Sequence, residues 1–169
     1  REKEIQEDKK EIISLIPQLQ LMQKDAEPTQ EAEILQGIKG IKTFTELILS
    51  KLEKGDEFCI LGAPKEAIEK LGAYFQEWHE RRAAKGIKCK VLFNRETEER
   101  AKKRKKTPLT EVRFLPDNIK TPALIEIGKG YVATILFGER PLCIVIRNKQ
   151  IYESYLEFFK LLWKQSKSF

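Results

Sequence analysis

Residues 57–94, EFCILGAPKEAIEKLGAYFQEWHERRAAKGIKCKVLFN, are the stretch that decides the fold. The apolar run FCIL is too short for a helix and ends at the turn residues GAP, which is typical of a buried strand. Apolar side chains then recur every three or four residues, as on one face of a helix, with Arg82 at the edge of that face. Gly86 suits a helix C-terminus, and the alternation in residues 87–93 predicts a second strand. This order predicts a right-handed parallel strand–helix–strand unit that needs cover on both faces of its sheet.

The flanking sequence supplies further elements of the same kinds. Short apolar runs bounded by turns predict strands, and a glycine turn predicts a hairpin between two of them. Amphipathic periodicity predicts two more helices. The predicted strands are 34–35, 111–115, 124–127, 131–137 and 142–146, and the predicted helices are 38–52 and 148–163. Residues 27–169 are therefore expected to form an α/β domain with a mixed, mostly parallel central sheet flanked by helices.

Composition and charge narrow the possible partners. With 169 residues, 41% of them hydrophobic, the chain is long enough for one core and an appendage. Its net charge of +6 divides into −4 on residues 1–33 and +10 on the remainder, and a basic body favours an anionic partner such as nucleic acid. No apolar run approaches the roughly 18 to 20 residues that cross a bilayer, so no membrane partner is expected. Because the sequence begins with Arg1 and not with Met, we expect it to be part of a longer protein.

The cysteines give no sign of a metal or redox site. Cys59, Cys89 and Cys143 are odd in number, form no CxxC pair and have no neighbouring histidine in the sequence. All three fall in predicted strands, where a cysteine acts as a small buried hydrophobic residue. Free thiols fit a reducing, cytoplasmic location. We predict no metal and no cofactor.

Residues 1–26 carry a heptad pattern. Its positions are held by Ile5, Ile12, Leu15, Leu19 and Met22. This pattern predicts a helical coiled-coil arm that makes a homodimer, and an amphipathic helix packed on its own domain is the alternative. Pro17 cannot take a regular interior position without a kink or break, and Ser14 could cap a second helix, so we expect a bend there.

Three segments resemble the C-terminal portion of archaeal TrmB-type transcriptional regulators. They are GIKGI at residues 37–41, GIKCKVLFN at residues 86–94, and residues 141–163. In that family a winged helix-turn-helix domain precedes a coiled-coil linker and an effector domain that looks like half of a phospholipase D fold. The resemblance implies that residues 27–169 are such an effector domain and that DNA is bound through a domain upstream of Arg1. It also implies a small-molecule effector, for which a sugar is one candidate.

No catalytic constellation is visible in the sequence. Phospholipase D chemistry uses a His-x-Lys-x-x-x-x-Asp motif, in which the histidine is the nucleophile and the lysine holds phosphate. The single histidine, His79, is followed by Glu80 and Arg81, and the predicted hairpin at residues 128–134 carries no such motif. The chain is therefore predicted not to be an enzyme, with a phosphodiesterase as the least favoured of three hypotheses.

Two groups of residues are candidates for binding. Open α/β sheets tend to bind ligands in the loops that follow parallel strands. The candidate ligand-binding residues are Gly62, Ala63, Pro64, Asn94 and Arg95, joined by Arg113. Their alternative role is that of ordinary connecting loops.

A run of five cations gives the second group. The candidate nucleic-acid-binding residues are Lys102, Lys103, Arg104, Lys105 and Lys106. Five consecutive cations cover every side of a helix, so this segment is not expected to be deeply buried. It is either a phosphate-binding patch or a solvated helix end. The leading hypothesis is therefore a regulator's effector and dimerisation domain, and a basic nucleic-acid-binding module is the alternative.

Overall fold

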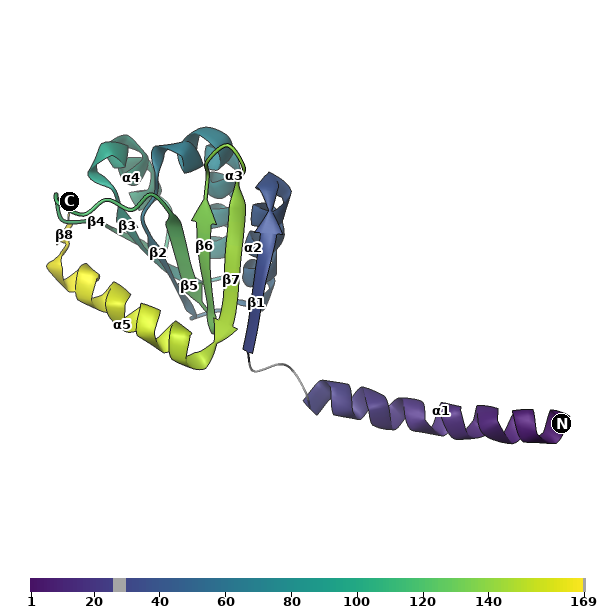
Figure 1. Cartoon of the computed structure of the whole chain (residues 1–169). Coiled ribbons are helices and arrows are strands. Elements are labelled where there is room, and N and C mark those ends of the chain that lie inside the picture. Colours follow the sequence, from purple (N-terminus) through teal and green to yellow (C-terminus); the bar gives the residue numbers. More distant parts are fainter. Residues whose placement is uncertain (26–29, 169) are drawn as a thin grey trace.

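One eight-stranded mixed sheet runs through the body of the computed structural model, which describes residues 1–25 and 30–168 (Figure 1). The strands are β1 (Gln30–Gln36), β2 (Glu57–Leu61), β3 (Lys88–Phe93), β4 (Thr110–Phe114), β5 (Leu124–Gly128), β6 (Tyr131–Leu136), β7 (Leu142–Asn148) and β8 (Lys167–Ser168). Their order across the sheet is β1-β7-β6-β5-β2-β3-β4-β8. The helices are α1 (Glu2–Asp25), α2 (Gly37–Lys51), α3 (Lys65–Ala84), α4 (Glu98–Lys105) and α5 (Lys149–Gln165), and a 3-10 turn, η1 (Arg95–Thr97), precedes α4.

The predicted strand–helix–strand unit is present as β2, α3 and β3. Strands β2 and β3 are adjacent and parallel, with Phe58 opposite Cys89. Gly86 ends the unit's helix with a φ of 77°, a conformation that glycine adopts without steric cost. The helix itself is bent at Leu71, whose φ of −133° and ψ of 16° lie outside the helical range. The periodicity of the sequence gives no indication of this bend.

The expectation of a mostly parallel sheet is wrong. Only the pairs β2–β3 and β3–β4 are parallel among the described strands, and the other five pairs are antiparallel. The cause lies in the short connections of the last third of the chain. Lys129 and Gly130, with φ of 50° and 83°, make a two-residue turn between β5 and β6. Such a turn joins antiparallel strands, whereas a parallel pair needs a crossover of a dozen or more residues.

Helices cover both faces of the sheet, which makes three layers (Figure 1). Phe58 and Ile60 point from β2 into the core under α2 and α3, together with Phe44 and Trp78. The alternate side chains of β2, Cys59 and Leu61, point into a second core under α5, where Phe159 is 1% exposed. The three cysteines are buried, as predicted, and burial raises the pKa of the Cys89 thiol to about 11.

Helix α1 runs without interruption through Pro17, so the expected bend is absent. Ser14 donates to the carbonyl of Glu11 and caps no second helix. Proline removes one backbone donor, and α1 stays helical around that loss. The apolar side chains of this helix that the structure describes do not pack on the α/β body: Ile12 is 61% exposed and Leu15 is 48% exposed. The side chains of Leu19 and Met22 lie outside the described residues.

Arg82 is fully buried, although its place in the sequence pattern indicated the edge of the apolar face. Its side chain donates to the carbonyl oxygens of Ile87, Leu109 (3.1 Å) and Pro108 (3.4 Å), to Thr110 Oγ1 (2.6 Å) and to His79 Nδ1 (3.3 Å). Burial lowers the pKa of the guanidinium, but an arginine surrounded by carbonyl acceptors remains charged. Arg82 therefore joins the end of α3 to the beginnings of β3 and β4.

Replacing Arg82 by methionine is expected to lower the free energy of unfolding by about 3 kcal/mol or more, because several buried acceptors would lose their donor. The matched control is Arg81→Met. The neighbouring Arg81 donates to both carboxylate oxygens of Glu46 at the surface, a pair worth about 1 kcal/mol or less. Denaturant unfolding of the two variants measures both losses, and equal losses would contradict the role given to Arg82.

Candidate functional site

A surface cleft of about 610 Å³ lies where the chain leaves β2 and β3. Pro64, which follows β2, and Asn94, which follows β3, both line it, as expected for a site beyond the ends of parallel strands. Charges of both signs surround it. The acidic residues of the lining are Glu66, Glu96 and Glu139, and the basic ones are Lys120 and Arg140. A cleft with charges of both signs and little net charge suits a polar ligand without a large net charge.

A loop that the sequence analysis missed, residues 115–123, closes one side of this cleft. Asn94 is 2% exposed and holds the loop by two bonds to Thr121: its Nδ2 donates to the carbonyl at 3.2 Å, and its Oδ1 accepts from Thr121 Oγ1 at 3.3 Å. Thr121 lines the cleft beside it. The contact joins residues 27 positions apart in the chain, so no local pattern in the sequence announces it.

Gly62 makes room for the same loop. Its φ is +79°, and a Cβ added to it would lie 2.0 Å from Thr121 Oγ1 and 2.8 Å from the carbonyl oxygen of Ala123. A residue with a side chain would therefore be strained there and would also displace the loop. Gly62 and Asn94 are thus placed to shape the cleft rather than to offer ligand contacts of their own.

The other predicted ligand-binding residues lie elsewhere. Ala63 lines an interior cavity beneath α3. Arg95 pairs with Asp117 at 3.1 Å and stacks on Phe114, with its guanidinium carbon 4.7 Å from the ring centre.

Arg113 does not join the cleft either. It donates to the carbonyl of Trp163 at 2.7 Å and lies 4.6 Å from the centre of the same residue's ring. Arg113 thereby ties β4 to the end of α5, and we leave it out of the candidate site.

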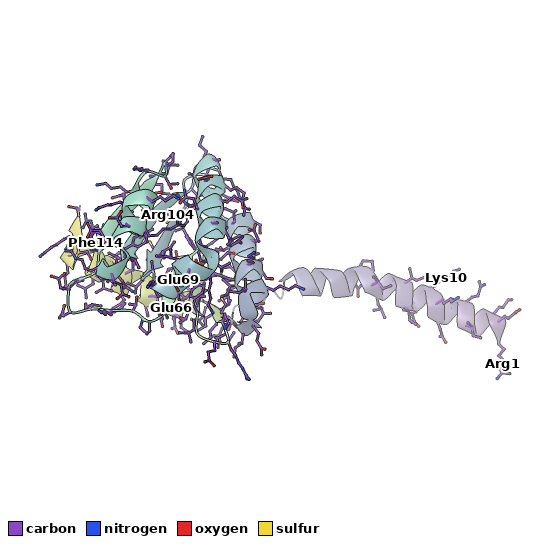
Figure 2. All side chains as sticks on the ribbon, turned by 90° about the horizontal axis from the view of Figure 1, so that it is seen from above. Arg1, Lys10, Glu66, Glu69, Arg104 and Phe114 are labelled. Atoms are coloured by element: carbon purple, nitrogen blue, oxygen red, sulfur yellow. The ribbon has the colours of Figure 1, made fainter. Side chains whose placement is uncertain are left out.

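The run of five cations is only partly exposed. It makes up the last four residues of α4 and the residue after it, and four of its members are exposed. Arg104 is 4% exposed, so the expectation that this segment is not deeply buried is wrong for this residue. Ala101, one turn earlier, is also buried, because this side of α4 lies against the rest of the domain. Figure 2 shows the labelled Arg104 within the body of the domain, whereas Lys10 and Arg1 stand clear of it on α1.

Nearby carboxylates offset part of the remaining charge. Lys102 pairs with Glu98 at 3.2 Å and with Glu99 at 3.0 Å, both on the same helix. Lys103 and Lys106 are exposed. The surface that could meet an anionic polymer is therefore smaller than the sequence suggests.

His79 lies inside the domain and is buried. It is 4% exposed, its ring lies edge-on to Trp78, and its Nδ1 accepts a bond from Arg82. Burial, followed by the charges of Arg104, Arg82 and Arg100, lowers the pKa of His79 well below its usual value. His79 is not among the residues that line the cleft beside Asn94. Among the described residues no cluster of His, Cys, Asp or Glu side chains could hold a metal ion, and no helix is long and apolar enough to cross a membrane.

Comparisons with known proteins identify the fold. No family model and no curated protein matches the sequence. Among solved structures, TrmBL2, an archaeal chromatin protein with a novel mode of DNA binding, superposes with a TM-score of 0.58 and 20% identity, covering 99% of this chain and 65% of its own. NucT from Helicobacter pylori has a TM-score of 0.62 and 11% identity, covering 83% of this chain and 99% of its own. Nuc from Salmonella typhimurium, a phospholipase D family member, has a TM-score of 0.54 and 12% identity, covering 83% and 98%.

These similarities confirm, at the level of the fold, the resemblance to TrmB-type regulators and to the phospholipase D fold. The chain spans about two thirds of the length of the TrmBL2 chain. At 11–20% identity the similarities do not transfer a function, since one fold hosts many functions.

Gly62→Ala is expected to destabilise the protein by at least about 1 kcal/mol, because the alanine would combine a positive φ with a clash against the 115–123 loop. Gly138→Ala is the control. Gly138 also lines the cleft, but an added Cβ there meets nothing within 4 Å. Thermal unfolding compares the two variants, and an unchanged melting temperature for Gly62→Ala would show that the loop is not packed on this glycine.

Proposed function

We propose that this chain is the effector-binding and dimerisation part of a TrmB-like transcriptional regulator. The observation that carries the proposal is the extent of the structural similarity. The similarity to TrmBL2 covers 99% of this chain, whereas the similarities to NucT and to Nuc each cover 83%. The part of this chain that NucT and Nuc leave uncovered amounts to about 29 of the 169 residues, and 29 residues precede β1. We infer that the long helix ahead of the sheet is shared with TrmBL2 and is absent from NucT and Nuc.

The proposed domain does not catalyse phosphodiester hydrolysis. The supporting observation is the burial of His79 described above, in a chain that lacks the His-x-Lys-x-x-x-x-Asp motif. The purified chain is expected to give no turnover of a generic phosphodiester such as bis(p-nitrophenyl) phosphate. Turnover by the wild type that is lost in His79→Ala, with the variant still folded by circular dichroism, would overturn this part of the proposal.

Dimerisation is assigned to α1. This helix has 24 residues and leaves Ile5, Ile12, Ile13, Leu15 and Ile16 exposed by 45–62%. A helix that buries none of its described apolar side chains is only marginally stable in water and gains most from a partner. A second copy of the same helix supplies the simplest partner, since the apolar positions recur at heptad spacing.

The chain is therefore expected to be dimeric at micromolar concentration, and residues 30–169 alone are expected to be monomeric. Ile12→Glu should have the same effect as the truncation, because it places a charge in the paired seam. Lys10→Glu, outside the heptad positions, is the matched control and should leave the dimer intact. Light scattering coupled to size exclusion measures all four proteins. A monomeric wild type, or a truncated protein that stays dimeric, would remove α1 from this role.

The proposed effector site is the cleft beside Asn94. Its volume of about 610 Å³ falls in the range of small-molecule sites, and its mixed charge favours a neutral hydroxylated ligand such as a sugar. Binding of such a ligand with an affinity unchanged by both Glu66→Lys and Arg140→Glu would place the effector elsewhere.

DNA binding by this chain alone is expected to be weak and independent of sequence. The exposed Lys103 and Lys106 can reach phosphates, but reading a sequence requires an element that enters a groove. Lys103→Gln with Lys106→Gln should reduce the slope of log affinity against log salt by about 2, as expected for two lost phosphate contacts.

A matched control uses Lys102→Gln with Lys120→Gln, since these two lysines already pair with carboxylates and should contribute less. Electrophoretic shifts of a random DNA duplex across a salt series measure both slopes. Tight, sequence-selective binding by the unmodified chain would favour the alternative, a direct nucleic-acid-binding module.

A further inference from the structure

A second and smaller cavity, of about 40 Å³, lies between the sheet and the helices α3 and α4. A single water needs roughly 10–15 Å³ of such space, so this cavity has room for a few non-hydrogen atoms. Ile60, Phe75 and Val91 make apolar walls. The polar groups of the lining are His79, Arg100, Arg104 and Glu126. A largely apolar space with a few polar groups in its lining is the usual form of a ligand site.

Glu126 occupies a position where the sheet otherwise presents apolar side chains. It lies on β5 between Ile60 of β2 and Ala133 of β6, and it is 4% exposed. Among the described residues no group donates to its Oε2. Burial raises the pKa of this carboxyl to about 8. At neutral pH Glu126 is therefore mostly protonated, and its O–H can donate into the cavity.

Arg104 of α4, which also lines the cavity, presents the complementary problem. It is 4% exposed, and its Nη1 has no acceptor among the described residues. Burial and the nearby Arg100 lower the pKa of Arg104, but a guanidinium keeps its charge at neutral pH. A buried charged donor without an acceptor is costly, and a small anion in the cavity would remove that cost.

The outer wall of the cavity is built at the bend in α3. Ile68 and Gly72, on either side of the bend at Leu71, line the cavity and are half-buried. Arg100 of α4 donates to the carbonyl of Gly72 and so holds the bent segment against α4. This wall is the least buried part of the lining, which makes it the natural route of entry.

We propose that this cavity binds a short-chain monocarboxylate of about the size of acetate. Its carboxylate lies between Arg104 Nη1 and the O–H of Glu126, and its alkyl end lies against Ile60, Phe75 and Val91. The charge-assisted bond from Arg104 supplies affinity, and the apolar walls select a ligand with a methyl or ethyl group over a fully polar anion. The site is separate from the cleft beside Asn94 and does not depend on the effector proposed there.

Glu126 gives this binding a characteristic pH dependence. The other titratable groups around it are His79 on α3, Arg100 and Arg104 on α4, and the buried thiols of Cys89 and Cys143. Between pH 6 and 8 the imidazole stays neutral, the thiols stay protonated and the guanidinium groups stay charged. Acetate itself remains ionised in this range. Binding should therefore weaken as pH rises through about 8, where Glu126 becomes an anion.

The test is titration of the full chain with sodium acetate against sodium chloride at constant ionic strength, followed by NMR shifts of the backbone amides of α4 and β5. Saturable shifts are expected with acetate and not with chloride. Arg104→Met should weaken acetate binding by at least about 10-fold, because the charged donor is lost. Lys103→Met, the exposed neighbour on the same helix, should leave the affinity unchanged.

Two further variants keep the test decisive if Arg104→Met does not fold. Glu126→Gln retains a neutral donor, so it should bind acetate at pH 7 and lose the weakening near pH 8. Ala67→Leu adds apolar volume to the cavity wall and should abolish binding in a folded protein. Shifts with acetate that do not saturate, or an affinity that is independent of pH in the wild type, would overturn the proposal. Ordered waters alone bridging Arg104 and Glu126 in a crystal grown with acetate would also overturn it.

Discussion

A buried guanidinium holds the central unit of this protein together. Arg82, at the end of α3, binds the carbonyl oxygens through which the chain enters β3 and β4. One of these belongs to Leu109, whose φ of 55° is unusual for a large side chain and is stabilised because its carbonyl also accepts from Cys89 N at 2.9 Å. The end of the crossover and the start of β4 are therefore held together by this one cation. Its burial is tolerated because its bonds go to groups that would otherwise need donors.

Local patterns in the sequence predict some parts of this fold and do not predict others. The β2–α3–β3 unit can be predicted because its apolar residues follow the period of a strand in β2 and β3 and the period of a helix in α3. Glycines mark the boundaries between these segments. The antiparallel order of β5, β6 and β7 against β2 is a matter of long-range pairing, which periodicity does not record. The same limit applies to the cleft, where Asn94 meets a loop far along the chain. Within the cation run, composition alone cannot tell Arg104 from its neighbours, since only the docking of α4 decides which side chain turns inward.

Glu126 is different, because a signal was present and was overlooked. A single carboxylate inside the apolar run LIEI of a strand is a departure from the pattern of a buried strand, and such departures tend to mark functional positions. Together with Arg104 it makes an interior polar site, while the cleft beside Asn94 makes an outer one. A phospholipase D family member and a DNA-binding chromatin protein share this fold, so the function of a chain on it depends on such sites and not on its topology.

The two edge strands of the sheet affect the tendency of this protein to aggregate at high concentration. An edge strand has unpaired backbone groups, to which strands of neighbouring molecules can hydrogen-bond. Many proteins begin to form fibres in this way. Strand β1 carries Glu31 and Glu33 along one margin, so an identical strand laid beside it would bring like charges together. The other margin is closed by β8, which has two residues, one of them Lys167. Short length and charge at the margins thus act against fibre growth, and they do so without adding to the stability of a single molecule.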